Sequence, residues 1–439
     1  MSEFDRAAIE ARAQEMTGLL AEQGVDLVAT TFVDNSGIVR TKAVPLRKLA
    51  EAAAWGVGAS NSFDFFLFND EITGGRYSRG PVGDLRLHPD LDRLTVLTAQ
   101  PGWAWAPGDR RTQDGAVHPQ DARGLAKHAV RMLGTRGFTV QLAFEVEWVA
   151  VADEPVGGPA YGYTRLSEHA DYLRAVVSAL DSQGIEVEQI HPEYAAGQFE
   201  LSVRAEDPVG AADTLVLVRE TIRKVSQSHG LRASFTPKFA PEGVGNGGHV
   251  HLSVSAGGEN LFGGGDRRFG MTALAEGFSA GILRRLPALM AIGAPSVVSY
   301  LRLEPHHWAG VFRVWGLENR EAPLRLIAGR SPNLEVKCFD LTANPYLVVA
   351  ALLFAGLDGM LGHAELPEPL DVDPGTLPDV ERLPSTLAEA VAAFESDELL
   401  NSTFGAELAT TLVDVRKGEI RVCEGLSPDQ LTEARRWLP

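Results

Sequence analysis

Four short segments of the chain place acidic or imidazole side chains on alternate residues. In each segment the residues between them are mostly apolar, and alternate residues of a β-strand point to opposite faces of a sheet. We therefore predict four strands that turn one face to the core and line a cleft with the other. The segments are Phe144–Trp148, Gln198–Leu201, His249–Ser253 and Leu334–Lys337.

The polar face of these strands carries many carboxylates. Carboxylates close together repel one another and raise each other's pKa, so they need a cation as compensation. Oxygen ligands with a single imidazole suit Mg²⁺ or Mn²⁺ better than zinc, and such ions commonly serve phosphoryl chemistry. Glu-x-Glu or His-x-His alone is more often a solvated or structural face, but their joint occurrence favours a metal site. The candidate ligands are Glu145, Glu147, Glu193, Glu200, His249 and Glu335.

Basic residues gather in the sequence around Glu335. Ordinary surface ion pairs would explain any one of them. Arg302 and Arg325, however, each stand between leucines, which places them on the polar face of predicted strands. Fixed guanidinium groups near bound metals would neutralise a transferred phosphoryl group and hold a substrate carboxylate. We therefore expect activation of a carboxylic acid by ATP, with a basic group formed by Arg302, Arg320, Arg325 and Lys337.

The elements that position these residues can be predicted from periodicity and turn signals. The start of the chain predicts a helix over 4–23 and a hairpin over 25–44 around the turn Asp34–Gly37. The Pro- and Gly-rich segment Pro101–Gly108 marks a predicted boundary, after which strands and helices alternate. Further helices are predicted over 124–133, 171–180, 212–228 and 344–361 and in the tail 387–438, with a surface loop over 367–384.

The bulk composition excludes several classes of protein. The 439 residues allow at least two domains, and the formal net charge of −18 argues against a nucleic-acid partner. No run of about 18 apolar residues predicts a membrane span, and residues 1–12 do not resemble a secretory signal. Cys338 and Cys423 are too few for a disulfide framework or a thiolate metal site. We expect a cytoplasmic protein without a membrane partner.

In this order, the segments resemble the glutamine synthetase family, and its type I-like members in particular, over most of the chain. The resemblance implies an α+β fold, with a small N-terminal β-grasp-like domain and its leading helix over residues 1–110. It implies a catalytic domain over 111–439 with a curved antiparallel sheet, a half-barrel flanked by helices. The matching stretches are the Asp34 turn, Glu145-x-Glu147, Glu193 with Ala196–Glu200, Gly247–His251, Ser299–Leu303, Asn319–Arg320 with Arg325, and Leu334–Glu335 followed by Asn344–Tyr346.

The resemblance also implies ATP, two or three Mg²⁺ or Mn²⁺ ions, and roles for individual residues. One ion would be held by Glu147, Glu193 and Glu200, and another by Glu145, His249 and Glu335. The implied contacts are Arg302 and Gly245 for the substrate amino acid, Arg320 and Arg325 for the transferred phosphate, and His251 and Ser253 for the nucleotide. Asp34 would complete the active site of a neighbouring subunit, in a hexameric ring or a dodecamer, and act on the incoming amine.

Several departures from the family pattern bear on specificity. Trp308 takes the place of a flap glutamate that helps to bind and deprotonate ammonium, and an indole suits an organic amine better. Asp34 remains for the amine, and His306 or His307 could substitute as base. Lys337 replaces an arginine whose bidentate contact it cannot reproduce, so the acid is held differently or is not glutamate.

Other differences concern loops and regulation. Asn333 replaces an arginine ahead of the metal-ligating Glu335, in a shortened segment, which bears on the ATP contacts. The glycine loop Val244–Gly248 also departs from the family pattern, and that loop touches the substrate amino acid. The last tyrosine is Tyr346, so control by adenylylation of a C-terminal tyrosine is not available to this chain.

The retained metal ligands and the altered amine site together favour one activity. We expect an ATP-dependent ligase that forms a γ-glutamyl amide from glutamate and an organic amine, such as ethanolamine or a polyamine, through a γ-glutamyl phosphate. In this respect the chain resembles γ-glutamylamide and γ-glutamylpolyamine synthetases. Trp308, His307 and Lys337 are further expected substrate contacts. Three alternatives stay open: glutamine synthetase proper, a ligase for a different acid, and a catalytically silent relative.

Overall fold

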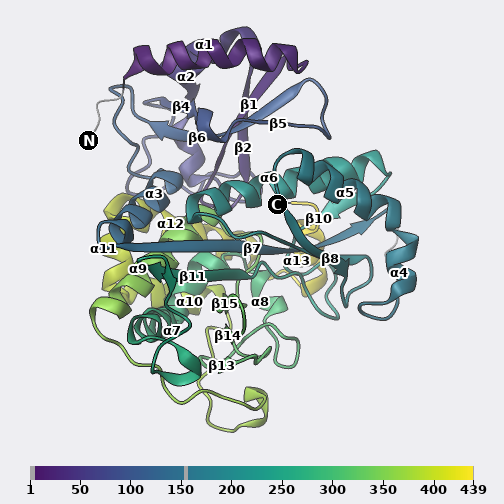
Figure 1. Ribbon diagram of the computed structural model, residues 1–439, viewed down its shortest axis with the longest axis vertical. Helices are drawn as coiled ribbons and strands as arrows, with labels where there is room; N and C mark the ends of the chain where they lie inside the picture. The colour runs from purple at the N-terminus through teal and green to yellow at the C-terminus, as the bar shows by residue number, and fades with distance from the viewer. Residues whose placement is uncertain (1–4, 153–156, 439) are drawn as a thin grey trace.

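The computed structural model describes residues 5–152 and 157–438, which form two β-sheets with helices packed on them (Figure 1). The leading helix is α1 (Arg6–Glu22), and Phe4 of the predicted helix lies outside the described residues. Helix α1 packs on α2 (Leu49–Trp55) at the top of Figure 1. Their buried residues form a small hydrophobic core with the sheet below them. The predicted N-terminal helix is therefore confirmed.

The N-terminal sheet has six strands in the order β2-β1-β6-β4-β3, with β5 paired to β6. Neighbouring strands are antiparallel apart from β1 and β6, which run parallel. The segment Pro101–Gly108, predicted as a boundary, lies largely within β6, because its residues 104–106 are buried and pair with β1. The strands are β1 (Leu27–Val33), β2 (Val39–Pro45), β3 (Val57–Ala59), β4 (Leu85–Pro89), β5 (Thr95–Val96) and β6 (Trp103–Arg111).

The turn between β1 and β2 confirms the predicted hairpin. The Asp34 carboxylate accepts hydrogen bonds from two backbone N–H groups of the turn, at 2.9 and 3.0 Å. Gly37 has a φ of 78°, and a Cβ there would lie 1.8 Å from the carbonyl oxygen of Thr342. Both the conformation and the close approach therefore require glycine. The side chain of Asn344 donates to the Asp34 carbonyl at 3.1 Å, which ties the turn to the second half of the chain.

The second sheet contains the four predicted carboxylate strands, as the neighbours β15, β11, β7 and β9. Its path is β13-β14-β15-β11-β7-β9-β8, with β10 paired to β7 and β12 to β11. The expectation of an antiparallel sheet needs one correction: β13 and β14 run parallel, so the sheet is mixed. The strands are β7 (Phe138–Val151), β8 (Val187–Pro192), β9 (Gln198–Val203), β10 (Arg232–Ser234), β11 (Val250–Ala256), β12 (Glu259–Asn260), β13 (Trp315–Leu317), β14 (Leu324–Ile327) and β15 (Asn333–Val336).

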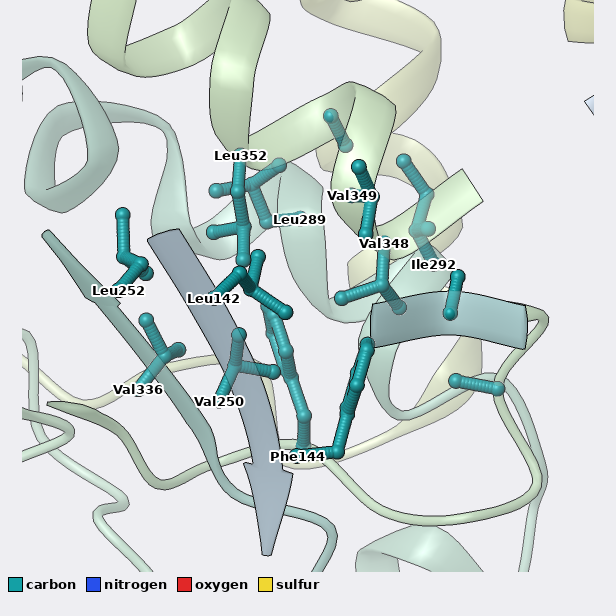
Figure 2. Close-up of a cluster of buried hydrophobic side chains, with 14 of the residues drawn as sticks. Leu142, Phe144, Val250, Leu252, Leu289, Ile292, Val336, Val348, Val349 and Leu352 are labelled. Atoms are coloured by element: carbon teal, nitrogen blue, oxygen red, sulfur yellow. The ribbon is translucent and has the colours of Figure 1, made fainter. Parts of the chain in front are cut away.

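Helices cover the apolar face of this sheet. The apolar helix α9 (Pro345–Leu361) begins at the N-cap Asn344, whose side chain accepts hydrogen bonds from two backbone N–H groups of the first turn. It packs on α7 (Ala273–Gly293), and both helices press on the sheet. Figure 2 shows this contact between the strand residues Leu142, Phe144, Val250, Leu252 and Val336 and the helix residues Leu289, Ile292, Val348, Val349 and Leu352.

The remaining predicted helices are also present. The Pro- and Asp-rich segment 367–384 contains only a short 3₁₀ turn and an isolated bridge, as expected for a surface loop. Within the described residues, no helix combines the length and the hydropathy that a membrane span requires. The other helices are α3 (Ala122–Gly134), α4 (Tyr163–Glu168), α5 (Ala170–Ser182), α6 (Pro208–Ser228), α8 (Ser299–Arg302), α10 (Leu387–Ser396), α11 (Glu398–Phe404), α12 (Ala406–Cys423) and α13 (Pro428–Arg435).

Candidate active site

The polar face of the second sheet lines a cavity of about 760 Å³. Side chains reach it from β7, β8, β9, β11, β14 and β15 and from the loops beside them. Two of the predicted site residues, Asp34 and Ser253, do not line it. Those that do are Glu145, Glu147, Glu193, Glu200, Gly245, His249, His251, Arg302, His307, Trp308, Arg320, Arg325, Glu335 and Lys337.

His249 lies at the centre of the carboxylates. Its Nδ1 lies 2.6 Å from Glu145 Oε1 and 3.5 Å from Glu335 Oε1, and its Nε2 lies 3.7 Å from Glu147 Oε1. Strand pairing brings them together, since His249 directly precedes β11, between β7 and β15. Potential ligand atoms of Glu145, Glu147, Glu200 and His249 all lie within 4.8 Å of one another, which suits a single divalent cation.

Two more groups of potential ligands adjoin this one. In the first, His251 Nε2 lies 3.7 Å from Glu145 and 3.8 Å from Glu335. These groups differ in two ways from the two ligand sets that the family resemblance implied. His251 belongs to one of them, and Glu147 lies with Glu145 instead of with Glu193. The two groups are Glu145, His251 and Glu335, and His191, Glu193 and Glu200.

His191 is a site residue that the sequence reasoning missed. Its Nε2 lies 3.2 Å from Glu200 Oε1, and its Nδ1 lies 3.8 Å from Glu193 Oε1. It lies one residue before the end of β8, directly opposite Glu200 of β9. His191 stands two residues before Glu193 in the sequence, so the same alternation that identified the other ligands would have found it.

Gln198 was also missed, and it organises the cleft from the start of β9. Its Nε2 donates to Glu147 Oε2 at 2.9 Å, to the Gly245 carbonyl at 3.0 Å and to Asn246 Oδ1 at 2.9 Å. The backbone N–H of Gly247 donates to the same Glu147 oxygen at 2.8 Å. These bonds fix one carboxylate and the glycine loop against each other. An amide side chain carries no sequence signal for this role.

Positive charge is spread unevenly over the carboxylates. Burial would raise the pKa of Glu335, but the charges of Lys337, His251 and His249 outweigh burial and hold the pKa at about 2. Lys337 Nζ lies 3.1 Å from Glu335 Oε1, and Arg325 lies 3.2 Å from its other oxygen. The Glu335 end of the cleft therefore carries its own compensation.

Glu200 is compensated much less: His191 is its only salt-bridge partner among the described residues, and Lys337 acts on it from further away. Burial and the neighbouring charges of Glu145, Glu147 and Glu193 raise the pKa of Glu200 to about 11. Burial and the Glu147 charge also raise the pKa of Glu193. A cavity with these oxygen donors, two or three imidazoles and an excess of negative charge fits a divalent cation of the Mg²⁺ or Mn²⁺ type.

Arg302 requires a correction, because it lies on α8 and not on a strand. The alternation of leucine and arginine in this segment belongs to a single helical turn, which three residues cannot distinguish from a strand. The guanidinium is buried and donates to the carbonyls of Phe339 at 3.3 Å and Lys337 at 3.1 Å. A Cβ on Gly247 would lie 2.8 Å from Arg302 Nη2, so the glycine loop allows this arginine to approach the cleft.

The rim of the cavity is aromatic. The ring centroids of Trp308 and Tyr194 lie 4.5 Å apart, and the ring planes form an angle of 34°. The backbone N–H of Trp308 donates to the Glu321 carboxylate at 2.8 Å. The neighbouring histidines differ. His307 lines the cavity and pairs with Glu304 at 3.0 Å, whereas His306 turns to Asp373 at 2.9 Å.

Asp34 lies outside this cavity, and its predicted role stays a prediction. Arg40 Nε donates to its carboxylate at 2.8 Å. Burial raises its pKa to about 6, although the Arg40 charge acts in the opposite direction. Ser253 lies on β11 opposite Gln141 of β7, away from the cavity lining. Its nucleotide contact also stays a prediction.

Two mixed sheets and a buried set of carboxylates and imidazoles, flanked by arginines, define a two-part α+β enzyme with a metal-type cleft. The family model described as "Glutamine synthetase, catalytic domain" matches residues 119–432. The chain belongs to the glutamine synthetase family, as the sequence resemblance implied.

Individual relatives match nearly the whole chain. The gamma-glutamylpolyamine synthetase GlnA3 of Streptomyces coelicolor is 52% identical over 97% of this chain and 96% of its own length. The glutamate–methylamine ligase of Methyloversatilis universalis is 29% identical over 89% of this chain and 92% of its own.

Solved structures agree with the fold. A structure described as a novel glutamine synthase homolog has a TM-score of 0.85 and 33% identity, and covers 94% of this chain and 98% of its own. A GmaS/ADP complex has a TM-score of 0.85 and 28% identity, and covers 94% of this chain and 96% of its own.

Proposed function

We propose that this protein is an ATP-dependent ligase that joins the γ-carboxylate of glutamate to an amino group of a polyamine or a related organic amine. The observation that carries the proposal is the aromatic pair Tyr194–Trp308 at the rim of a carboxylate-lined cleft. Aromatic faces bind organic cations, and they offer a small ammonium ion no carboxylate partner. The similarity to GlnA3 and to a glutamate–methylamine ligase supports the same chemistry.

The reaction proceeds in two steps. A γ-carboxylate oxygen of glutamate attacks the terminal phosphorus of ATP, the bond to the bridging oxygen breaks, and ADP leaves. The amine nitrogen then attacks the carbon of the resulting acyl phosphate. A C–N bond forms, the C–O bond to phosphate breaks, and a base takes the proton from nitrogen. Divalent ions, when bound, neutralise phosphate charge and align the reacting groups.

The basic residues divide into two kinds. Arg325 and Lys337 contact Glu335, so they hold a metal ligand in place. Arg320 lines the cavity and forms no ion pair with another described residue, which leaves its guanidinium for a phosphoryl group. Arg302, buried beside Gly245, holds the carboxylate of the amino acid. Lys337 contacts Glu335, so we assign it to the support of that metal ligand. Glutamate can then be the acid although position 337 carries no guanidinium group.

The base and the assembly are part of the proposal. Asp34 lies outside the cleft of its own chain, so we assign it to the cleft of a neighbouring subunit in a cytoplasmic homo-oligomer, a hexameric ring or a dodecamer. His307 lines the cleft and is the base available within one chain. We assign a nucleotide contact to His251, which lines the cleft, and to Ser253, further along the same strand.

Phosphate release with glutamate, ATP and Mg²⁺ tests the proposal. We expect putrescine and spermidine to raise the rate at least tenfold over the amine-free reaction, ammonium to raise it weakly, and mass spectrometry to identify the γ-glutamyl amide. Trp308→Glu should improve the use of ammonium and weaken that of polyamines, whereas Trp55→Glu, on the exposed face of α2, should change neither. The proposal is wrong if no amine accelerates phosphate release.

A further inference from the structure

A second cavity, of about 350 Å³, adjoins the cleft. Tyr194 and Val244 line both cavities, so these two residues form the wall between them. Val149, Ala196 and Phe239 give the second cavity a mainly apolar lining. No step of the proposed reaction uses this space.

One carboxylate stands in this apolar cavity. Glu242 is exposed and has no ion-pair partner among the described residues. The ammonium group of Lys238, in the same loop, is buried and donates to the carbonyl of Gly243. Lys238 therefore holds the loop in place and does not pair with Glu242. The cavity offers apolar contact along its walls and one carboxylate that forms no ion pair with another described residue.

The walls between the two cavities are held rigidly. Arg165 donates to the carbonyls of Ala195 at 2.9 Å and Gln198 at 3.1 Å, and the Ala195 N–H donates to Gln198 Oε1 at 2.8 Å. These bonds fix the turn that carries Tyr194. On the other side, Gln198 Nε2 binds the Gly245 carbonyl at 3.0 Å and fixes the loop. A preformed pocket of this kind binds a flexible ligand at a lower entropic cost.

We infer that this side cavity binds the distal end of an aliphatic di- or polyamine whose near amino group reacts in the cleft. The inference rests on the proposed function and adds a second binding subsite to it. Methylene groups pack against the apolar walls. A charged amino group within the ligand lies against the faces of Tyr194 and Trp308, and the ammonium group at its distal end pairs with Glu242. Monoamines lack this last contact, so the subsite selects for length and for a second charge.

Kinetics with propylamine, putrescine and spermidine test the inference in the full-length protein. Glu242→Gln should raise the KM for spermidine roughly three- to fivefold relative to the KM for propylamine, since an exposed ion pair contributes modestly. Ala240→Phe, which fills the cavity from its exposed side, should do the same without removing a charge. Glu259→Gln, an exposed carboxylate on β12, is the matched control.

The outcomes separate this inference from the proposed function. If the unaltered protein forms no amide with any amine, the proposed function is wrong and the subsite falls with it. If amides form but neither Glu242→Gln nor Ala240→Phe changes the ratio of the spermidine and propylamine KM values, only the subsite is wrong. Equal loss with both amines in both variants would also overturn it, because a general defect does not select for length.

Discussion

Two clusters of buried carboxylates in this molecule differ in what neutralises them. One, which we call the Arg123 cluster, joins the two halves of the chain. Arg123 lies 2.8 Å from Asp90 and from Asp109 and 2.7 Å from Asp213, and Lys127 lies 2.8 Å from Asp109. Burial alone would raise the pKa of Asp90 and of Asp109, yet Arg123 and Lys127 outweigh it and lower both.

In the cleft, Lys337 and Arg325 compensate Glu335, but Glu200 shows the opposite balance. Burial and like charges raise the pKa of Glu200 to about 11, and no arginine or lysine forms a salt bridge with it among the described residues. A cluster that stabilises the fold contains its own counter-ions. A carboxylate that binds a cation lacks a fixed counter-ion of this kind until the cation arrives. The direction of the pKa shift thus distinguishes Glu200 from Asp90 and Asp109.

The largest expected effect concerns the structural cluster. Arg123→Met would leave the buried carboxylate of Asp213 and the partly buried carboxylates of Asp90 and Asp109 around an apolar side chain. We expect the free energy of unfolding to fall by about 3–5 kcal/mol, the usual cost of removing one partner from a buried ion pair. Urea-induced unfolding measures it. Arg204→Met, in the exposed pair with Glu186, should cost less than about 1 kcal/mol. Equal effects of the two substitutions would contradict the distinction.

The sequence made the cleft cluster predictable and the Arg123 cluster not. Alternation along a strand is a backbone property, so the shared face of Glu145 and Glu147 follows from spacing alone. Arg123 is separated in the sequence by 33 residues from Asp90, 14 from Asp109 and 90 from Asp213, and no local pattern predicts that they meet. The segment around Arg302 was predicted as a strand, but it forms one turn of helix, which its short alternation of leucine and arginine could not indicate.

The sequence also did not predict which side chains contact each other in the cleft. Lys337 lines the cavity and its substrate contact stays a prediction, but its contact with Glu335 was not foreseen. Tyr194 has no periodicity or motif that predicts stacking on Trp308, because that contact joins a turn of the sheet to a distant loop. Residue type and spacing thus predicted which side chains face the cleft. Partners across the cleft depended on folding of the whole chain.

Asp34 is an intermediate case, because Arg40 contacts it but burial still raises its pKa to about 6. A carboxyl group that binds its proton more tightly in the folded state favours folding below its unfolded pKa, near 3.8, and loses this contribution as the pH rises through about 6. The loss amounts to about 3 kcal/mol for a shift of roughly two pH units.

Asp34→Asn should therefore remove a decline in stability between about pH 4 and 6. Unfolding free energies of both proteins across this range measure it, and the unaltered protein should lose stability relative to the variant as the pH rises. Asp92→Asn, in an exposed pair with Arg12, should follow the unaltered protein. Parallel curves for all three proteins would show that Arg40 fully compensates Asp34.

The smallest and most specific effect concerns Glu200. Glu200→Gln keeps the size of the side chain and replaces a carboxyl that, with a pKa of about 11, holds its proton at neutral pH until a cation displaces it. Without divalent ions, the variant should be as stable as the unaltered protein or more stable by about 1 kcal/mol, because the Glu200 carboxyl must take up a proton on folding and the amide does not. With Mg²⁺ or Mn²⁺, its gain in thermal stability should be smaller by about 1–2 kcal/mol, since a ligand stabilises a protein in proportion to its binding.

Differential scanning calorimetry with and without the ion measures both changes. Glu424→Gln, at an exposed position after α12, should leave both the ion-free stability and the gain unchanged. The opposite pattern, with a large loss of stability without ions and an undiminished gain with them, would place Glu200 among the structural carboxylates. A functional carboxylate is one whose removal leaves the ion-free fold intact and weakens its response to the ion.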